Sequence, residues 1–267
     1  MRIVFLCLVV FGLSAIALWR TDGFSPESIR SPLLAVGDPQ PVPIEWPKRF
    51  HYLDKGRQAF AFESEDGKYV LKFFKSLKMA WYMDFPFLEK NKRRLQEKIR
   101  IYPESYYLAF DQMREETGLL AVHLGASEEK YPVITLIDKA SGTHQVDLNQ
   151  VPFILQKKGN GPFLTGLEQN RTEILDQFFA MHRKRIALCI ADHDRDIRRN
   201  YCWDGKELLY IDPARFYYDL ELQDPKRALA EWKKVTYPLR KWLKAHAPDE
   251  VALIDKRVND AMDPFLD

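Results

Sequence analysis

The chain changes from a strand-like to a helix-like pattern about midway, and this change constrains its fold more than any other feature. In the first half, apolar and polar residues alternate over short segments separated by tight turns. The clearest segments are residues 50–53, 59–63 and 69–74. Asp66-Gly67, in the turn before the third segment, is a strong hairpin signal. The pattern therefore predicts three consecutive antiparallel strands.

Further elements follow these strands. Proline in the first turn and periodic apolar residues predict helices over residues 86–100 and 103–117. More strands are expected at residues 119–124, 133–138 and 153–156. From Gly166 the pattern is helical, with helices expected at residues 167–185, 228–245 and 249–262. A β-rich half followed by a helical half predicts an α+β fold, with domains at residues 48–158 and 159–267.

Residues 3–19 form an uninterrupted apolar run between Arg2 and Arg20. Its length is at the low edge for a membrane span and somewhat above that of a typical signal-peptide core. Residues 1–20 are therefore expected to be either an uncleaved signal anchor or a cleaved signal peptide. Either alternative predicts a chain that is membrane-anchored or exported, with the side of the membrane left open. Residues 21–47 are rich in proline and predict an extended linker.

Charge and cysteine content limit the possible partners. The net charge is only +2 over 267 residues, which gives no reason to expect a nucleic-acid partner. The three cysteines lack the spacing of a metal site. Cys189 and Cys202 either pair in an exported chain or remain reduced core thiols. The basic helix at residues 86–100 is either a solvated face or a surface for an anionic membrane or sugar phosphate.

The side chains that indicate a chemistry lie in one loop and the strand that follows it. Residues 192–200 are dense in acids and bases and end on Asn200. The apolar segment 208–211 then leads to Asp212. Carboxylate and amide oxygens of this kind hold divalent metals and position a hydroxyl for phosphoryl transfer. The alternative is a hairpin with a charged loop whose acids pair with nearby arginines.

The run from His193 to Asn200 resembles the H-R-D-x-x-x-x-N catalytic loop of protein kinases, and the segment that begins with Asp212 resembles their D-F-G element. The resemblance implies that Asp194 orients the acceptor hydroxyl and that His193 braces the loop. It also implies that Asn200 and Asp212 bind Mg²⁺. Pro213 follows Asp212 in place of phenylalanine, so a D-F-G switch is not expected.

The loop does not match the kinase spacing. In protein kinases the Asp lies five residues before the Asn, whereas Asp194 lies six and Asp196 four residues before Asn200. Asp194 is preferred as the catalytic residue because it directly follows His193. Asp196 is then either a second acid near the metal or a partner for an arginine, and Asp192 is assigned a structural role.

The resemblance also points to residues of the first half. Lys72 ends a strand that follows a hairpin, as does the kinase lysine that meets the nucleotide phosphates, and Glu104 is its expected partner. Gly56 and Arg57 stand in the turn where kinases have a glycine-rich loop, and they are expected to meet phosphate. The competing candidates are Lys75 for the lysine and Glu89, Glu97, Glu115 and Glu116 for the acid.

Together these features predict an α+β, protein-kinase-like two-lobed fold preceded by an apolar signal or anchor helix. The implied activity is transfer of the ATP γ-phosphate to a hydroxyl, with ATP and Mg²⁺ as cofactors. A sugar, lipid or glycan acceptor suits the expected location. A catalytically inactive binding or scaffold module at the cell envelope is the alternative, since the glycine-rich loop is almost absent. Metal-assisted hydrolysis by the loop acids is a third possibility.

Overall fold

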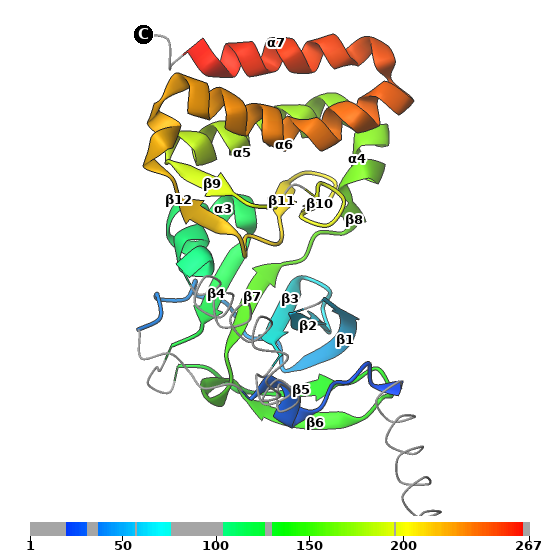
Figure 1. Cartoon of the computed structure of the whole chain (residues 1–267). Coiled ribbons are helices and arrows are strands. Elements are labelled where there is room, and N and C mark those ends of the chain that lie inside the picture. Colours follow the sequence, from blue (N-terminus) through cyan, green and yellow to red (C-terminus); the bar gives the residue numbers. More distant parts are fainter. Residues whose placement is uncertain are drawn as a thin grey trace, which may run out of the picture. The chain divides into compact units, whose positions relative to one another are not determined.

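The computed structural model describes residues 20–30, 37–56, 58–75, 104–125, 130–194 and 196–263. The chain divides into two compact units, which are drawn in Figure 1. Unit 1 comprises residues 1–96 and 120–158, and unit 2 comprises residues 97–119 and 159–267. The helix expected at residues 86–100 lies outside the described residues.

Unit 1 is built on a mixed seven-stranded sheet with the order β4-β7-β3-β2-β1-β5-β6. The strands are β1 (Arg49–Lys55), β2 (Ala59–Ser64), β3 (Tyr69–Phe74), β4 (Leu119–His123), β5 (Val133–Ile137), β6 (Thr143–Asp147) and β7 (Phe153–Lys157). The three consecutive antiparallel strands predicted from the sequence are confirmed as β1, β2 and β3. β5 pairs parallel with β1, a non-local contact that short turns cannot produce. Unit 1 also contains the short 3-10 helices η1 (Pro26–Ile29) and η4 (Leu148–Gln150).

The hairpin between β2 and β3 follows from its turn residues. Gly67 has a φ of +71°, a left-handed conformation in which a side chain is strained. Asp66 accepts hydrogen bonds from the Ser64 hydroxyl at 2.6 Å and from the Lys68 amide at 3.1 Å. These bonds fix the register that places Leu71 and Phe73 on the core face of the sheet.

Aromatic rings fill the core of unit 1. Phe24, near the start of the predicted linker, makes edge contacts with Phe60 and Phe62, at centroid distances of 5.4 and 4.9 Å. Phe73 and Phe153 continue the cluster and are fully buried. Part of the predicted linker is therefore packed into the core rather than extended in solvent.

Unit 2 combines helices with short strands. Its helices are residues 104–112, α3 (Arg114–Thr117), α4 (Phe163–Gln169), α5 (Arg171–Ala187), α6 (Pro225–His246) and α7 (Val251–Met262). Its strands are β8 (Gly161–Pro162), β9 (Ile190–Asp192), β10 (Tyr201–Trp203), β11 (Leu208–Tyr210) and β12 (Phe216–Tyr218). Two 3-10 helices, η5 (Leu220–Gln223) and η6 (Pro248–Glu250), flank α6. β11, β10 and β8 form one small sheet, and β12 pairs with β9 in another.

The helices of unit 2 pack around stacked aromatic rings. α6 begins where the Asp224 carboxylate caps the amides of Lys226 and Arg227. On its buried face, Trp232 stacks on Phe179 of α5 with a centroid distance of 5.3 Å and an interplanar angle of 16°. α7 packs against α6 and α5, as Figure 1 shows. α5 also contacts the strand β9.

The predicted fold, with two kinase-like lobes preceded by an apolar signal or anchor helix, was wrong. The described residues form an α+β protein with a mixed sheet, in which β5 and β6 extend the sheet beyond β1. No helix among the described residues is long and apolar enough to cross a bilayer. The apolar helix that was expected to precede two kinase-like lobes falls on residues 1–20, of which only Arg20 is described.

Candidate active site

The loop that carries the candidate residues begins where strand β9 ends. β9 pairs with β12, which sets Asp192 opposite Phe216. The guanidinium of Arg185, fully buried on α5, donates to the Ile190 carbonyl at 2.7 Å and to the Glu231 carboxylate of α6 at 2.8 Å. Glu231 also accepts the Asp192 amide at 3.3 Å. A buried ion pair therefore fixes the strand from which the loop leaves.

Asp192 joins the two ends of the loop. Its side chain is 1% exposed and accepts a hydrogen bond from the Tyr210 hydroxyl. The same hydroxyl oxygen accepts from Asn200 Nδ2 at 3.3 Å. Asp192 Oδ1 accepts the Asp194 amide at 2.7 Å. Burial raises the pKa of Asp192 to about 6, so this carboxyl group holds its proton more tightly than an exposed one. These contacts give Asp192 the structural role expected for it.

The loop acids also shape the loop locally. The Asp194 carboxylate accepts the Asp196 amide at 3.0 Å, and the Asp196 carboxylate accepts the Arg198 amide at 3.1 Å. With Asp192, three successive acids each accept an amide two residues further on, which is the pattern of Asx turns. The acids at alternate positions therefore stabilise the conformation of the loop, in addition to any part they take in its chemistry.

Asp194 and Asp196 differ in their partners. Asp196 accepts two hydrogen bonds from the Arg198 guanidinium, at 3.0 and 3.2 Å, and these lower its pKa. Among the described residues, the one ion pair of Asp194 is with Arg215, whose Nε lies 4.0 Å from the carboxylate, and the Asp194 side chain is 33% exposed. Asp194 is therefore the loop carboxylate that is more open to a substrate hydroxyl. Arg195, between the two acids, lies outside the described residues.

His193 lies on the solvent side of the same loop. Its ring stacks on Tyr217 of β12, with a centroid distance of 4.2 Å and an interplanar angle of 14°. Its amide donates to the Arg215 carbonyl at 3.3 Å. Partial burial lowers the pKa of His193, and the nearby charges of Lys234 and Arg215 lower it further. The ring is thus held against β12 and is mostly neutral at pH 7.

The backbone segments that carry Asn200 and Asp212 are hydrogen-bonded to each other. The Ile211 amide donates to the Asn200 carbonyl at 2.7 Å, so Asp212 follows directly after the residue that is bonded to Asn200. The Asn200 side chain is buried, whereas Asp212 is exposed. Tyr106, from the helix at residues 104–112, places its hydroxyl 3.4 Å from Asp212 Oδ1. The structure therefore positions both predicted ligands from neighbouring chain segments.

The oxygen donors of this site have the chemistry that magnesium requires. Asn200 Nδ2 donates to Tyr210, which leaves the amide oxygen as the atom that can bind a cation. Asp212 and Asp194 add carboxylate oxygens, and hard oxygen donors are those that Mg²⁺ prefers. Within the described part of the chain, no three His, Cys, Asp or Glu side chains gather to hold a metal. The residues fit the mode in which one or two protein oxygens and the substrate phosphates share the ion.

The lysine candidates lie in unit 1. Lys72 is half-buried on β3, between Ala61 of β2 and Ile154 of β7, and on the face opposite the core residues. Lys75 follows the strand. Its ammonium donates to the Gly56 carbonyl at 2.7 Å and lies 4.7 Å from the centroid of the Phe60 ring. Lys75 is thus engaged within the turn.

The remaining candidates have different outcomes. Gly56 has room for a Cβ, whose nearest neighbour would be the Ala59 carbonyl oxygen at 3.8 Å, so the fold does not require glycine there. Arg57 lies outside the described residues. Glu104 is exposed in unit 2, at the start of the helix at residues 104–112. The residue after it, Ser105, donates to the Phe216 carbonyl at 2.7 Å and attaches this helix to β12.

Sequence reasoning missed the buried residues that support the loop. Arg185, Glu231 and Lys234 connect α5 and α6 to β9, and the Lys234 ammonium donates to the Asp192 carbonyl and to Glu231. The signal was present, because Arg185 and Glu231 are charged residues within otherwise apolar helix faces. A charge at such a position requires a buried partner. Their pairing was not predictable from spacing, since they are far apart in the sequence.

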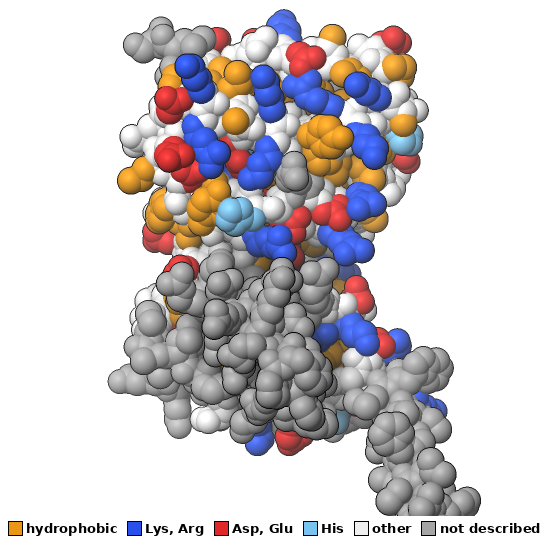
Figure 2. Space-filling model, viewed as in Figure 1, with side chains coloured by type: hydrophobic (Ala, Val, Ile, Leu, Met, Phe, Trp, Pro, Cys, Tyr) orange, Lys and Arg blue, Asp and Glu red, His pale blue; other side chains and the backbone are white. Residues whose placement is uncertain are grey.

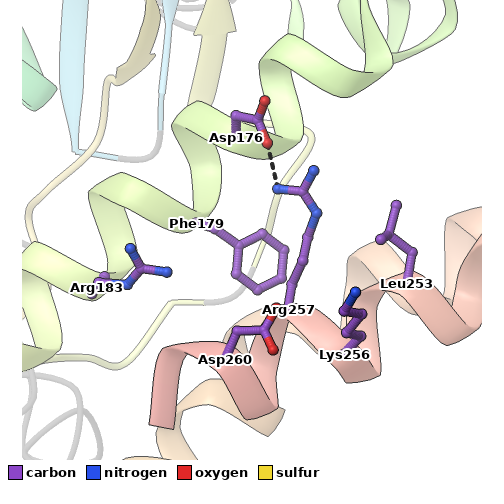
Figure 3. Close-up of a pocket in the computed structure, with 7 residues that line it drawn as sticks. All are labelled: Asp176, Phe179, Arg183, Leu253, Lys256, Arg257 and Asp260. Carbon is purple, nitrogen blue, oxygen red and sulfur yellow. Dashed lines mark hydrogen bonds and ion pairs between the residues drawn. The ribbon is translucent and has the colours of Figure 1, made fainter. Parts of the chain in front are cut away.

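A separate pocket lies on the opposite side of α5 from these contacts. It measures about 280 Å³ between α5 and α7. Figure 3 shows Arg257 of α7 paired with Asp176 of α5, at 2.6 Å, beside the ring of Phe179. None of the candidate residues lines this pocket. Cys189, which is buried, and Cys202, which is half-buried, are not joined to each other.

Comparisons with known proteins identify no family. No family model matches the chain, and no curated protein matches it. Among solved structures, it resembles the bifunctional kinase-methyltransferase WbdD, with a TM-score of 0.38 and 16% sequence identity. The match covers 77% of this chain and 42% of WbdD. The likeness is distant and carries no argument about fold or activity, so the functional conclusion rests on the residues described above.

Proposed function

We propose that this chain is a phosphotransferase that moves the γ-phosphate of ATP to a hydroxyl group. The observation that carries the proposal is the contrast among the three loop acids. Asp192 is buried and hydrogen-bonded to Tyr210, and Asp196 is paired with Arg198. Asp194 remains partly exposed, on a loop that is fixed at both ends. A carboxylate held in this way can accept a hydrogen bond from a hydroxyl and orient it for attack.

The other candidates take supporting roles. Asn200 and Asp212 would hold Mg²⁺, which when bound neutralises phosphate charge. Lys72 of unit 1 stays a prediction for the lysine that contacts the nucleotide phosphates, and Glu104 of unit 2 stays a prediction for the acid. His193, stacked on Tyr217, keeps the Asp194 backbone in place. A sugar, lipid or glycan is the favoured acceptor, because these carry free hydroxyls and suit a chain at a membrane.

The turn around Gly56 favours a second candidate function. A Cβ fits at Gly56, and its carbonyl is bound by Lys75, so this turn lacks the open glycine backbone that usually cradles phosphate. This observation supports a catalytically inactive binding module. Both candidates bind a ligand, and they differ only in whether the chain transfers a phosphate group.

The test is phosphorus NMR of Mg²⁺-ATP incubated with the full chain and mixed sugar and lipid-headgroup hydroxyls. We expect a new phosphate-ester signal and ADP from the native chain. The Asp194→Asn variant should lose at least a hundredfold in rate, which is the usual scale for a positioned acid-base group. Asp249→Asn, an exposed acid on η6, is the matched control and should match the native rate. ATP left intact by the native chain, or unchanged transfer by Asp194→Asn, would contradict the proposal.

A further inference from the structure

The solvent side of α6 carries lysines and one aromatic ring but no carboxylate. Four exposed lysines and an exposed tyrosine form what we call the α6 basic face: Lys226, Lys233, Tyr237, Lys241 and Lys244. Their spacings of seven, four, four and three residues place them on one side of a helix. Tyr237 is 61% exposed in the middle of the face. Lys226 and Lys244 are separated by roughly 27 Å along the helix axis, at about 1.5 Å per residue.

The acids near this face are used elsewhere. Glu231, the only carboxylate of α6, is buried and bonded to Arg185 and Lys234. Asp224 caps the start of the helix. Asp255 of α7 pairs with Arg240. Within the described residues no ion pair involves any of the four lysines, so no described carboxylate neutralises their charges.

Basic side chains are numerous on this part of the surface. Figure 2 shows Lys and Arg side chains, with some acidic and hydrophobic ones among them, over the part of unit 2 that α6 and α7 occupy in Figure 1. The chain as a whole has a net charge of only +2. The α6 basic face is therefore a local concentration of charge rather than a reflection of a generally basic protein.

We propose that the α6 basic face binds the surface of an anionic lipid bilayer. Polybasic clusters of about four to eight lysines or arginines on an amphipathic helix are typical of such surfaces. Lysine acts as a point charge without a fixed bonding geometry, which suits an array of mobile headgroups. Tyr237 adds an amphipathic ring of the kind enriched at the membrane–water interface.

Charge chemistry favours a bilayer over nucleic acid. Base recognition relies on side chains that enter a groove and on the planar fork of arginine. The cations of the α6 basic face are all lysines, and they lie on the outer surface of one helix. This surface shares no residue with the candidate active site, so its binding to lipid does not depend on phosphate transfer.

The experiment is vesicle sedimentation with the full chain. Vesicles of phosphatidylcholine alone are compared with vesicles of phosphatidylcholine and phosphatidylserine. The apolar run at residues 3–19 can bind any bilayer, so the readout is the ratio of the affinities for anionic and neutral vesicles. The test variant is Lys233→Gln/Lys241→Gln/Lys244→Gln. The control is Lys130→Gln/Lys206→Gln/Lys256→Gln, which removes the same charge from exposed positions elsewhere.

We expect the native chain to prefer anionic vesicles. Each lysine contributes about fivefold to such binding, so the test variant should lose on the order of a hundredfold in the ratio. The control variant should keep the native ratio of affinities. Raising salt from about 0.1 to about 1 M, which shortens the screening length from about 10 to about 3 Å, should abolish the preference. Tyr237→Ala should lower the ratio less than the triple variant.

Three results would overturn the proposal. The first is a native ratio near one. The second is a test variant that keeps the native ratio while it remains folded by circular dichroism. The third is complete displacement from anionic vesicles by duplex DNA at the same phosphate concentration, which would assign the face to nucleic acid instead.

Discussion

Tyr210 donates its hydroxyl hydrogen to the buried carboxylate of Asp192, and this bond ties strand β11 to the loop that carries Asp194. Asn200, at the other end of the loop, donates to the same tyrosine oxygen. The buried hydroxyl of Tyr210 therefore holds both ends of the loop in place. The precision of any chemistry at Asp194 depends on this contact, although Tyr210 itself is out of reach of a substrate because it is 1% exposed.

Asp192 should make stability depend on pH. Its pKa is raised from 3.8 to about 6, so the folded state holds the proton more tightly than the unfolded chain. Its contribution to stability is therefore full below pH of about 4 and lost as the pH rises through about 6. A shift of roughly two units corresponds to about 3 kcal/mol.

The Asp192→Asn variant isolates this effect, because asparagine does not titrate. Compared with the native chain, the free energy of unfolding of Asp192→Asn should rise by up to about 3 kcal/mol between pH of about 4 and about 7. Urea denaturation at several pH values measures it. A difference between the two proteins that stays constant over this range would show that Asp192 does not titrate as described.

Removing one partner of the buried Arg185–Glu231 pair should destabilise unit 2. Glu231→Ala leaves the fully buried Arg185 guanidinium without its carboxylate, and the expected loss is about 3–5 kcal/mol. Asp176→Ala is the control, because it removes an exposed ion pair with Arg257 and should cost less than about 1 kcal/mol. Urea unfolding followed by tryptophan fluorescence, to which buried Trp232 contributes, compares them. Equal losses in the two variants would contradict the assigned role.

A second buried pair should stabilise unit 1. Asp38 contacts His123 Nδ1 at 2.5 Å and accepts the amides of Leu124 and Gly125 at 2.9 and 2.8 Å. Asp38→Ala removes all of these acceptors and should cost about 3 kcal/mol or more, since unsatisfied buried donors cost about 1–3 kcal/mol each. Asp38→Asn keeps an acceptor and should lose less. The melting temperature of each variant measures this order, and a reversed order would refute it.

The local parts of the fold were predictable because they depend on neighbouring residues. Asp66-Gly67 specifies its hairpin, and Gly118, a glycine directly after the predicted helix, caps the end of α3 with a φ of +63°. The helix expected over residues 103–117 is interrupted at Met113, whose backbone is not helical. β6 was missed because its sequence is largely polar, with only Val146 buried.

The support of the site was not predictable for a different reason. The pairing of Arg185 with Glu231, and of Asp192 with Tyr210, joins residues that are distant along the chain. The sequence shows that a charged residue on an apolar helix face needs a partner. Which residue becomes the partner of Arg185 is decided only by the packing of α5 against α6. The acids of the loop could be identified from the sequence, whereas the differences in their surroundings could not.

The central claim is that Asp212 and its neighbours bind a magnesium nucleotide, and calorimetric titration of the full chain with Mg²⁺-ATP tests it most directly. The native chain should bind, Asp212→Ala should lose at least tenfold in affinity, or about 1.4 kcal/mol, and Asp249→Ala should bind as the native chain does. No heat of binding from the native chain, or equal affinities for native and Asp212→Ala proteins, would contradict the account.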